Sequence, residues 1–231
     1  MTAITTTSAD LVEDRPIDTT KGSRSAALRR GFFVASPVLA GILLLVATIA
    51  DPGAGSTGEE MNRAYTNNPD ALQWHSLTLH WSYAFWGVTA FMAAAYVKGR
   101  GAVLANIGAF LGFVGMTTLP GIVAIDWYDS SIGQIYGVDA IGSLHEHMDK
   151  TLWALPFFAA PGIIGLLLCL PVAAAALWRA GVVRWWSFVA VLAGTATFMG
   201  SGVTVWGVSL TAVLFTVLGL ELARGTRSPR V

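Results

Sequence analysis

The hydrophobic residues of this chain are gathered in long runs that polar segments separate. Runs without a charged residue extend over 31–50, 74–97, 103–125 and 152–178. An α-helix rises ~1.5 Å per residue, so each run is long enough to cross a hydrocarbon core of roughly 30 Å. Backbone polar groups need internal partners in lipid, so each run predicts a transmembrane helix.

A further apolar stretch, 185–223, is too long for one crossing. Gly200, Ser201 and Gly202 lie at its middle, where glycine favours a break. Splitting there gives spans at about 185–200 and 203–222. The pattern therefore predicts an all-α fold, a polytopic membrane bundle of six transmembrane helices within a domain at 31–223.

Composition agrees with this fold class. Hydrophobic residues make up 54% of the chain and charged residues 12%, whereas soluble domains carry about 25% charged residues. The mean hydropathy is +0.60. The lipid bilayer is therefore the expected surrounding of the chain, and its first partner.

The basic residues predict the orientation, because Lys and Arg accumulate on the cytoplasmic side. They lie in the N-terminal segment, in the turns near 98–100 and 179–184, and after residue 223; Arg63 and Lys150 are the exceptions. Both termini are therefore expected in the cytoplasm. Residues 1–30 are expected to be a disordered cytoplasmic tail and 224–231 a basic one, while the extracytoplasmic loops are acidic.

Small residues predict where the helices touch, since transmembrane helices approach closely at Gly and Ala. The third span has such a face at Gly108, Gly112 and Gly115. The second span has another, formed by Gly87, Ala90 and Ala94.

Polar residues follow one stripe of the second span. Asn68 and Pro69 suit a helix start, so this helix is expected to begin in the outer loop. Along it, steps of three or four residues align a stripe that we expect to face the bundle interior as a candidate cofactor-binding surface: Gln73, Ser76, His80 and Tyr83. The alternative is ordinary packing, with His80 hydrogen-bonded to Ser76 or Tyr83.

All four histidines are expected on the outer side, His75 and His80 on the second span and the other two before the fourth. Ser143 and Glu146 have capping-box spacing. A helix there places His145 and Asp149 on one face, whereas an extended segment pairs His145 with His147. Imidazole and carboxylate bind transition metals, and one candidate metal set consists of His80, Asp126, His145, His147 and Asp149. The alternative is a solvated loop without a ligand.

Other chemistry has little support. The sequence contains no phosphate-binding glycine loop, nucleophile elbow or HExxH motif. Its basic residues follow topology rather than forming a patch, which argues against a nucleic-acid partner. A non-enzymatic role is therefore favoured, with no catalytic residue assigned.

Tyr65, Asn68-Pro69, Leu72-Gln73 and the pair Asp126 and Asp129 carry a resemblance. With the hydropathy layout of residues 30–223, the chain resembles uncharacterised six-span membrane proteins of high-GC Gram-positive (actinobacterial) bacteria. The resemblance implies a bacterial plasma membrane and no assigned activity.

Three functions remain open. The leading hypothesis is an accessory or sensory subunit whose acidic, histidine-bearing outer face contacts a ligand or another membrane protein. A second is a membrane redox protein that binds a transition metal or haem. A third is a small-molecule permease, and the feature that favours it is the proline-containing fourth span.

Overall fold

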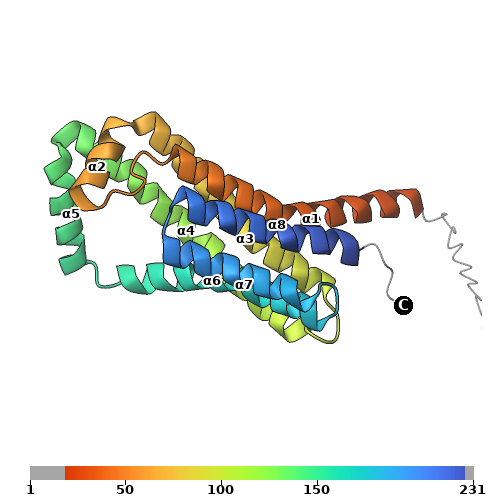
Figure 1. The fold of residues 1–231 in the computed structure, drawn as a ribbon. Helices are drawn as coiled ribbons and strands as arrows, with labels where there is room; N and C mark the ends of the chain where they lie inside the picture. The colour runs from red at the N-terminus through yellow and green to blue at the C-terminus, as the bar shows by residue number, and fades with distance from the viewer. Residues whose placement is uncertain (1–18, 227–231) are drawn as a thin grey trace, which may run out of the picture.

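The computed structural model describes the backbone of residues 19–226 and the side chains from Arg24 onward. This part of the chain is helical and contains no strand (Figure 1). The elements are α1 (Thr19–Ala50), α2 (Gly58–Asn67), α3 (Pro69–Tyr96), α4 (Ala102–Tyr136), α5 (Val138–Thr151), α6 (Leu155–Arg179), α7 (Trp185–Ser201) and α8 (Val205–Gly225). For these residues, the prediction of an all-helical bundle is confirmed.

The predicted breaks between helices occur where glycine or proline permits them. Gly202, at φ 62°, separates α7 from α8 in the left-handed region that favours glycine. Pro69 is the first residue of α3, where its missing N–H leaves no helical bond unmade. The expected split of 185–223 and the expected start of the second long helix are both confirmed.

Four helices are long and apolar enough to cross a membrane: α1, α4, α6 and α8. The other two long helices, α3 and α7, are not among them. α7 has 17 residues, and α3 carries many polar residues near its start. The described part of the chain is thus a helical bundle with four membrane-capable helices.

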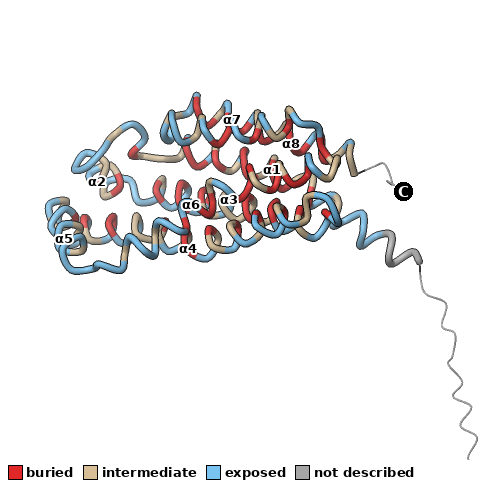
Figure 2. The backbone as a smooth tube through the Cα atoms, turned by 90° about the horizontal axis from the view of Figure 1, so that it is seen from below, coloured by how far each residue is buried: buried red, intermediate tan, exposed pale blue. Residues whose placement is uncertain are grey.

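The long helices pack in a closed circuit. Contacts follow the order α1, α3, α4, α6, α7, α8 and back to α1, and α3 also touches α6 across the bundle. Buried residues line the inner faces of the long helices (Figure 2). The short helices α2 and α5 lie at one end, and both described chain ends lie at the other (Figure 1).

Glycines bring α4 close to two neighbours. A Cβ added at Gly115 would lie 2.8 Å from the backbone nitrogen of Leu166 in α6, and one at Gly112 would lie 3.2 Å from the Cα of Gly87 in α3. Gly108 likewise faces the α6 backbone at Ala173. The predicted small-residue face of the third span is confirmed, and it serves both α3 and α6.

One aromatic cluster joins the two halves of the bundle. Trp86 of α3 is fully buried, and its ring lies 5.9 Å from Phe198 of α7 and 4.8 Å from Phe215 of α8, centroid to centroid. Both pairs have the edge-to-face geometry that aromatic rings prefer. α3 is therefore the central helix despite its polar residues.

Several predicted boundaries are corrected. α1 begins at Thr19, so residues 19–30, expected to be disordered, are helical; the part of that prediction on 1–18, and residues 227–231 of the predicted C-terminal tail, lie outside the described residues. α4 continues to Tyr136, well past the predicted end at 125. Its 35 residues span about 52 Å, more than a ~30 Å hydrocarbon core, so its last turns extend beyond any span.

Candidate functional site

The candidate site is a polar cap at the end of the bundle opposite the start of α1 and the end of α8 (Figure 1). We define the cap as residues 51–80 and 126–151, which include α2, α5, the first turns of α3 and the last turns of α4. Its two basic residues form ion pairs within their own helices, Arg63 with Glu59 and Lys150 with Glu146. The remaining carboxylates, which include Asp51, Glu60, Asp70, Asp126, Asp129, Asp139 and Asp149, leave the cap acidic.

α2 is held against the bundle by Tyr65. This residue is buried, and the edge of its ring lies against Gly53 in the loop after α1. Its backbone carbonyl accepts a hydrogen bond of 2.9 Å from Ser130 Oγ in α4. Burial raises the pKa of the Tyr65 hydroxyl, and the nearby carboxylates of Asp51 and Asp126 raise it further. Tyr65 therefore acts as a neutral anchor.

α5 is held by one apolar side chain and one polar pair. Ile141 is fully buried. It lies where α2 and α4 approach, because a Cβ added at Gly133 would come within 2.0 Å of Thr66 Oγ1 and 3.1 Å of Ile141 Cδ1. The absence of a side chain at Gly133 thus allows α2, α4 and α5 to meet at one point.

The polar pair is Asp129 with His145. The Nε2 atom of His145 lies 3.0 Å from Asp129 Oδ1 and 2.9 Å from Oδ2. The Asp129 side chain is 10% exposed and that of His145 is 42% exposed, so the pair stands at the edge of the cap. Burial raises the pKa of Asp129, and the hydrogen-bonded His145 opposes this. Burial is the larger cause.

A groove lies beside these anchors, between α3 and α4. It has a volume of about 370 Å³. Gln73 of α3 and Trp127, Ser131 and Gln134 of α4 line it, so amide, hydroxyl and aromatic groups face the space. Gln134 also donates to the carbonyl of Thr66, at 3.4 Å. The groove offers neutral hydrogen-bonding groups inside an acidic surrounding.

The predicted metal set is not assembled as a group. Within residues 24–226, the structure has no cluster of three or more His, Cys, Asp or Glu arranged to hold a metal ion. His80 packs its ring on Trp81, and His147 and Asp149 are exposed. Asp126 is partly buried. Among the histidines and carboxylates predicted on the outer side, the structure pairs Asp129 with His145. The metal or haem hypothesis stays a prediction.

The predicted capping box is wrong. α5 begins at Val138, five residues before Ser143, so Ser143 lies inside the helix and its hydroxyl donates to the carbonyl of Asp139 at 3.1 Å. Gly137, at φ 91°, ends α4 and starts α5. The helix α5 therefore starts earlier than predicted, because it follows directly on the glycine turn that ends α4 and does not wait for a serine cap.

The polar stripe predicted on α3 faces the interior in part. Ser76 is fully buried, whereas His80 and Tyr83 are half-buried and Gln73 is exposed. Gln73 instead lines the groove between α3 and α4.

A second polar face of α3, different from the predicted stripe, makes the hydrogen bonds to α1. His75 Nδ1 lies 2.9 Å from the carbonyl oxygen of Ala47, and Ser82 Oγ donates to that of Ala40 at 2.7 Å. Thr89 Oγ1 donates to Ser36 Oγ at 2.9 Å. These three residues are spaced by seven, which places them on one helix face, and this spacing is the sequence signal that identifies the face in contact with α1.

The fold and the cap together define a class: a helical membrane protein with a polar cap at one end of its bundle. No family model, no curated protein and no solved structure matches the chain.

Proposed function

We propose that the chain is a six-span membrane protein of the bacterial plasma membrane, with both termini in the cytoplasm. In this proposal it is a non-enzymatic accessory or sensory subunit, and its extracytoplasmic cap contacts a ligand or a partner membrane protein. The observation that carries the proposal is the placement of the polar helices α2 and α5 together at the end opposite the start of α1 and the end of α8 (Figure 1).

The proximity of the first part of α1 to the end of α8 supports an even number of crossings. Arg30, which directly precedes the apolar run of α1, donates from Nε to Thr226 Oγ1 at 2.9 Å and from a terminal nitrogen to the carbonyl of Ala223 at 3.3 Å. A chain that begins and ends on one side of a bilayer crosses it an even number of times. The basic residues at the ends of the long helices lie at this same end, as the positive-inside rule expects for a cytoplasmic face, whereas Arg63 and Lys150 lie in the cap.

The packing of α3 supports its inclusion as a span. Contacts with α1, α4 and α6 surround it, and its polar groups His75, Ser82 and Thr89 bond to α1. Polar side chains satisfied inside a bundle are tolerated at membrane depth. α7 pairs with α8 through a short turn, and its 17 residues reach about 26 Å, close to the needed thickness.

The topology is tested by labelling single cysteines. Cys169 is buried, so a cysteine introduced at an exposed site dominates the labelling. We expect Ser143→Cys, in α5, to react with a membrane-impermeant maleimide in intact cells. Ala27→Cys, in the exposed start of α1, should react only after permeabilisation. The unmodified protein is the control.

Two outcomes contradict the proposal. Labelling of Ala27→Cys but not of Ser143→Cys in intact cells would reverse the orientation. Labelling of both from outside would place the cap and the start of α1 on one side and contradict the three proposed crossings between them.

The contact role is tested at the groove between α3 and α4. We expect the photoreactive residue p-benzoylphenylalanine, placed at Trp127, to form an adduct in cells, detected as a mass shift of the α4 peptide. The same residue at Tyr136, which is 75% exposed on the same helix but outside the groove, is the matched control. The adduct should disappear when Ser131→Trp fills the groove. No adduct at Trp127, or equal adducts at both sites, contradicts a contact at the cap.

A further inference from the structure

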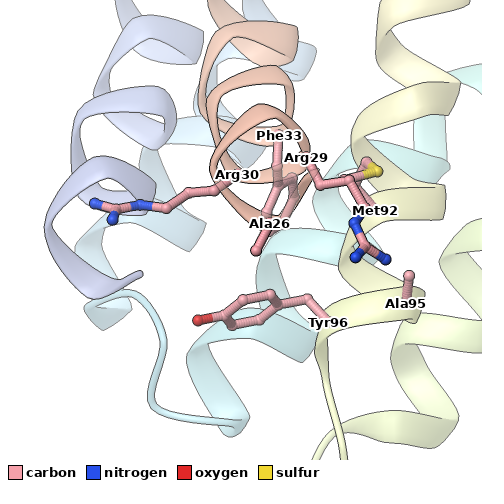
Figure 3. A pocket seen from close by; sticks show the side chains of 7 residues that line it. All are labelled: Ala26, Arg29, Arg30, Phe33, Met92, Ala95 and Tyr96. Carbon is pink, nitrogen blue, oxygen red and sulfur yellow. The ribbon is translucent and has the colours of Figure 1, made fainter. Parts of the chain in front are cut away.

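A second groove lies between α1 and α3, at the end of the bundle where α1 starts and α8 ends. Its volume is about 240 Å³. Figure 3 shows the side chains that line it, which include Ala26, Arg29 and Phe33 of α1 and Met92, Ala95 and Tyr96 of α3. No part of the cap contributes to this groove.

The walls of the groove are apolar and its rim is polar. Phe33 is 1% exposed, and its ring lies 5.8 Å from that of Tyr96, which is 45% exposed. Tyr96 is the last residue of α3, and Arg29 comes just before the apolar run that starts at Gly31. Tyrosine and arginine at the ends of apolar runs occupy the headgroup level of a bilayer.

The two arginines at the groove have different roles. Arg30 points toward α8, where it bonds to Thr226 and Ala223 (Figure 3). Arg29 extends to the other side, toward Met92 and Ala95 (Figure 3). Its Nε makes a long contact of 3.4 Å with the carbonyl of Ser25, one turn earlier in its own helix. The guanidinium of Arg29 is therefore the charge that the groove presents to a ligand.

The charges at this end favour an anion. The buried carboxylate at this end of the described chain, Glu221, is paired with Arg224 at 2.8 Å and lies 3.9 Å from Arg184. The other described carboxylates belong to the cap, at the far end of the bundle. A guanidinium binds phosphate oxygens strongly, through two parallel N–H groups.

We propose that this groove binds the headgroup of an anionic phospholipid. Arg29 holds the phosphate, and an acyl chain lies against Met92 and Phe33. Basic pockets between transmembrane helices on the cytoplasmic side suit anionic lipid headgroups. The inference rests on the proposed function in one respect, namely that this end of the bundle lies at a membrane surface.

The test is lipid binding to the purified full chain in a non-ionic detergent, followed by native mass spectrometry. The probes are phosphatidylglycerol, phosphatidylcholine and inorganic phosphate. We expect one phosphatidylglycerol to bind more tightly than either other probe. Arg29→Gln should weaken this binding roughly tenfold, the usual size of one charge-assisted hydrogen bond. Arg29→Lys should retain part of it.

The matched control is Arg100→Gln, which removes the same charge from the exposed turn between α3 and α4, outside the groove. Its affinity for phosphatidylglycerol should change less than twofold. Equal losses in both variants would mean non-specific attraction and overturn the proposal. So would unchanged binding by Arg29→Gln, or equal binding of phosphatidylcholine. Inorganic phosphate that binds as well as the lipid would assign the groove to a free anion instead.

These outcomes are independent of the topology test. Binding in detergent does not depend on which side of the membrane the groove faces, so a failure of lipid binding leaves the cysteine labelling valid. A reversed labelling pattern, in turn, would leave the measured lipid affinity unchanged while removing the cytoplasmic assignment. Melting of each variant without lipid checks that it is folded.

Discussion

Replacing Gly133 with alanine should loosen the cap and leave the rest of the bundle intact. The new methyl group would lie 2.0 Å from Thr66 Oγ1 and 3.1 Å from Ile141 Cδ1, where ordinary contact begins at 3.4 Å. Thr66 has little freedom to turn away, because its hydroxyl donates to the carbonyl of Asn62 at 2.7 Å. The helix α2, which carries Thr66, must therefore move away from α4 by more than an ångström, and the Ile141 side chain of α5 must shift by a few tenths of an ångström.

The size of the effect follows from two opposing terms. Overpacking of a filled site costs about 1–3 kcal/mol, and the severe overlap at Gly133 puts it at the upper end of this range. Alanine in place of glycine within a helix stabilises the helix by about 1 kcal/mol. The net loss of about 1–2 kcal/mol increases local opening of the cap by roughly 5- to 30-fold.

Hydrogen exchange of the purified protein measures this directly. Amides of α2 and α5 should lose protection in Gly133→Ala, while those of α6 and α8 should keep it. Gly142→Ala is the matched control, since the same substitution on α5 meets nothing within 4 Å. It should keep or raise the protection of α5. Equal exchange in the two variants, or a loss spread evenly over all helices, would refute the close meeting of α2, α4 and α5 as the basis of the cap.

Three further predictions concern the bundle, the polar pair and the metal alternative. Gly165→Ala would place a methyl 2.6 Å from the backbone oxygen of Leu111 and should lower stability by about 1–3 kcal/mol in thermal melts, whereas Gly121→Ala, with nothing nearer than 3.8 Å, should be close to neutral. The pKa of Asp129 is raised in the folded state, so the folded chain holds this proton more tightly than the unfolded chain; stability from this group is fully present below the usual value of 3.8 and is lost as pH rises through the raised pKa. Melting midpoints of Asp129→Asn across pH should lack this decline, and an unchanged pH profile would contradict it. A Soret band or stoichiometric metal in the purified protein, lost in His80→Ala, is the signature of the haem or metal hypothesis, and the cap proposal expects neither.

Sequence alone placed the long helices well, because their limits depend on local physics. Uninterrupted apolar runs, the glycines near 200–202 and the proline at 69 each act on their own segment of chain, and most helix limits lie near them. The start of α1 at Thr19 and the end of α4 at Tyr136 lie outside their apolar runs. The small residues of α4 were equally informative, since close helix contact requires them wherever the partner lies. The short helix α2 and the start of α5 were missed, because polar segments outside the apolar runs have no such strong pattern.

The tertiary structure decided which polar groups meet. Asp129 and His145 lie 16 residues apart on two different helices, and their pairing depends on the turn at Gly137 and on the contact of Ile141 with α2 and α4. Sequence periodicity predicted the stripe with His80 on α3, whereas packing against α1 uses the face with His75. Hydropathy and charge are properties of residues along one helix, whereas the rotation of each helix about its axis is fixed by its neighbours.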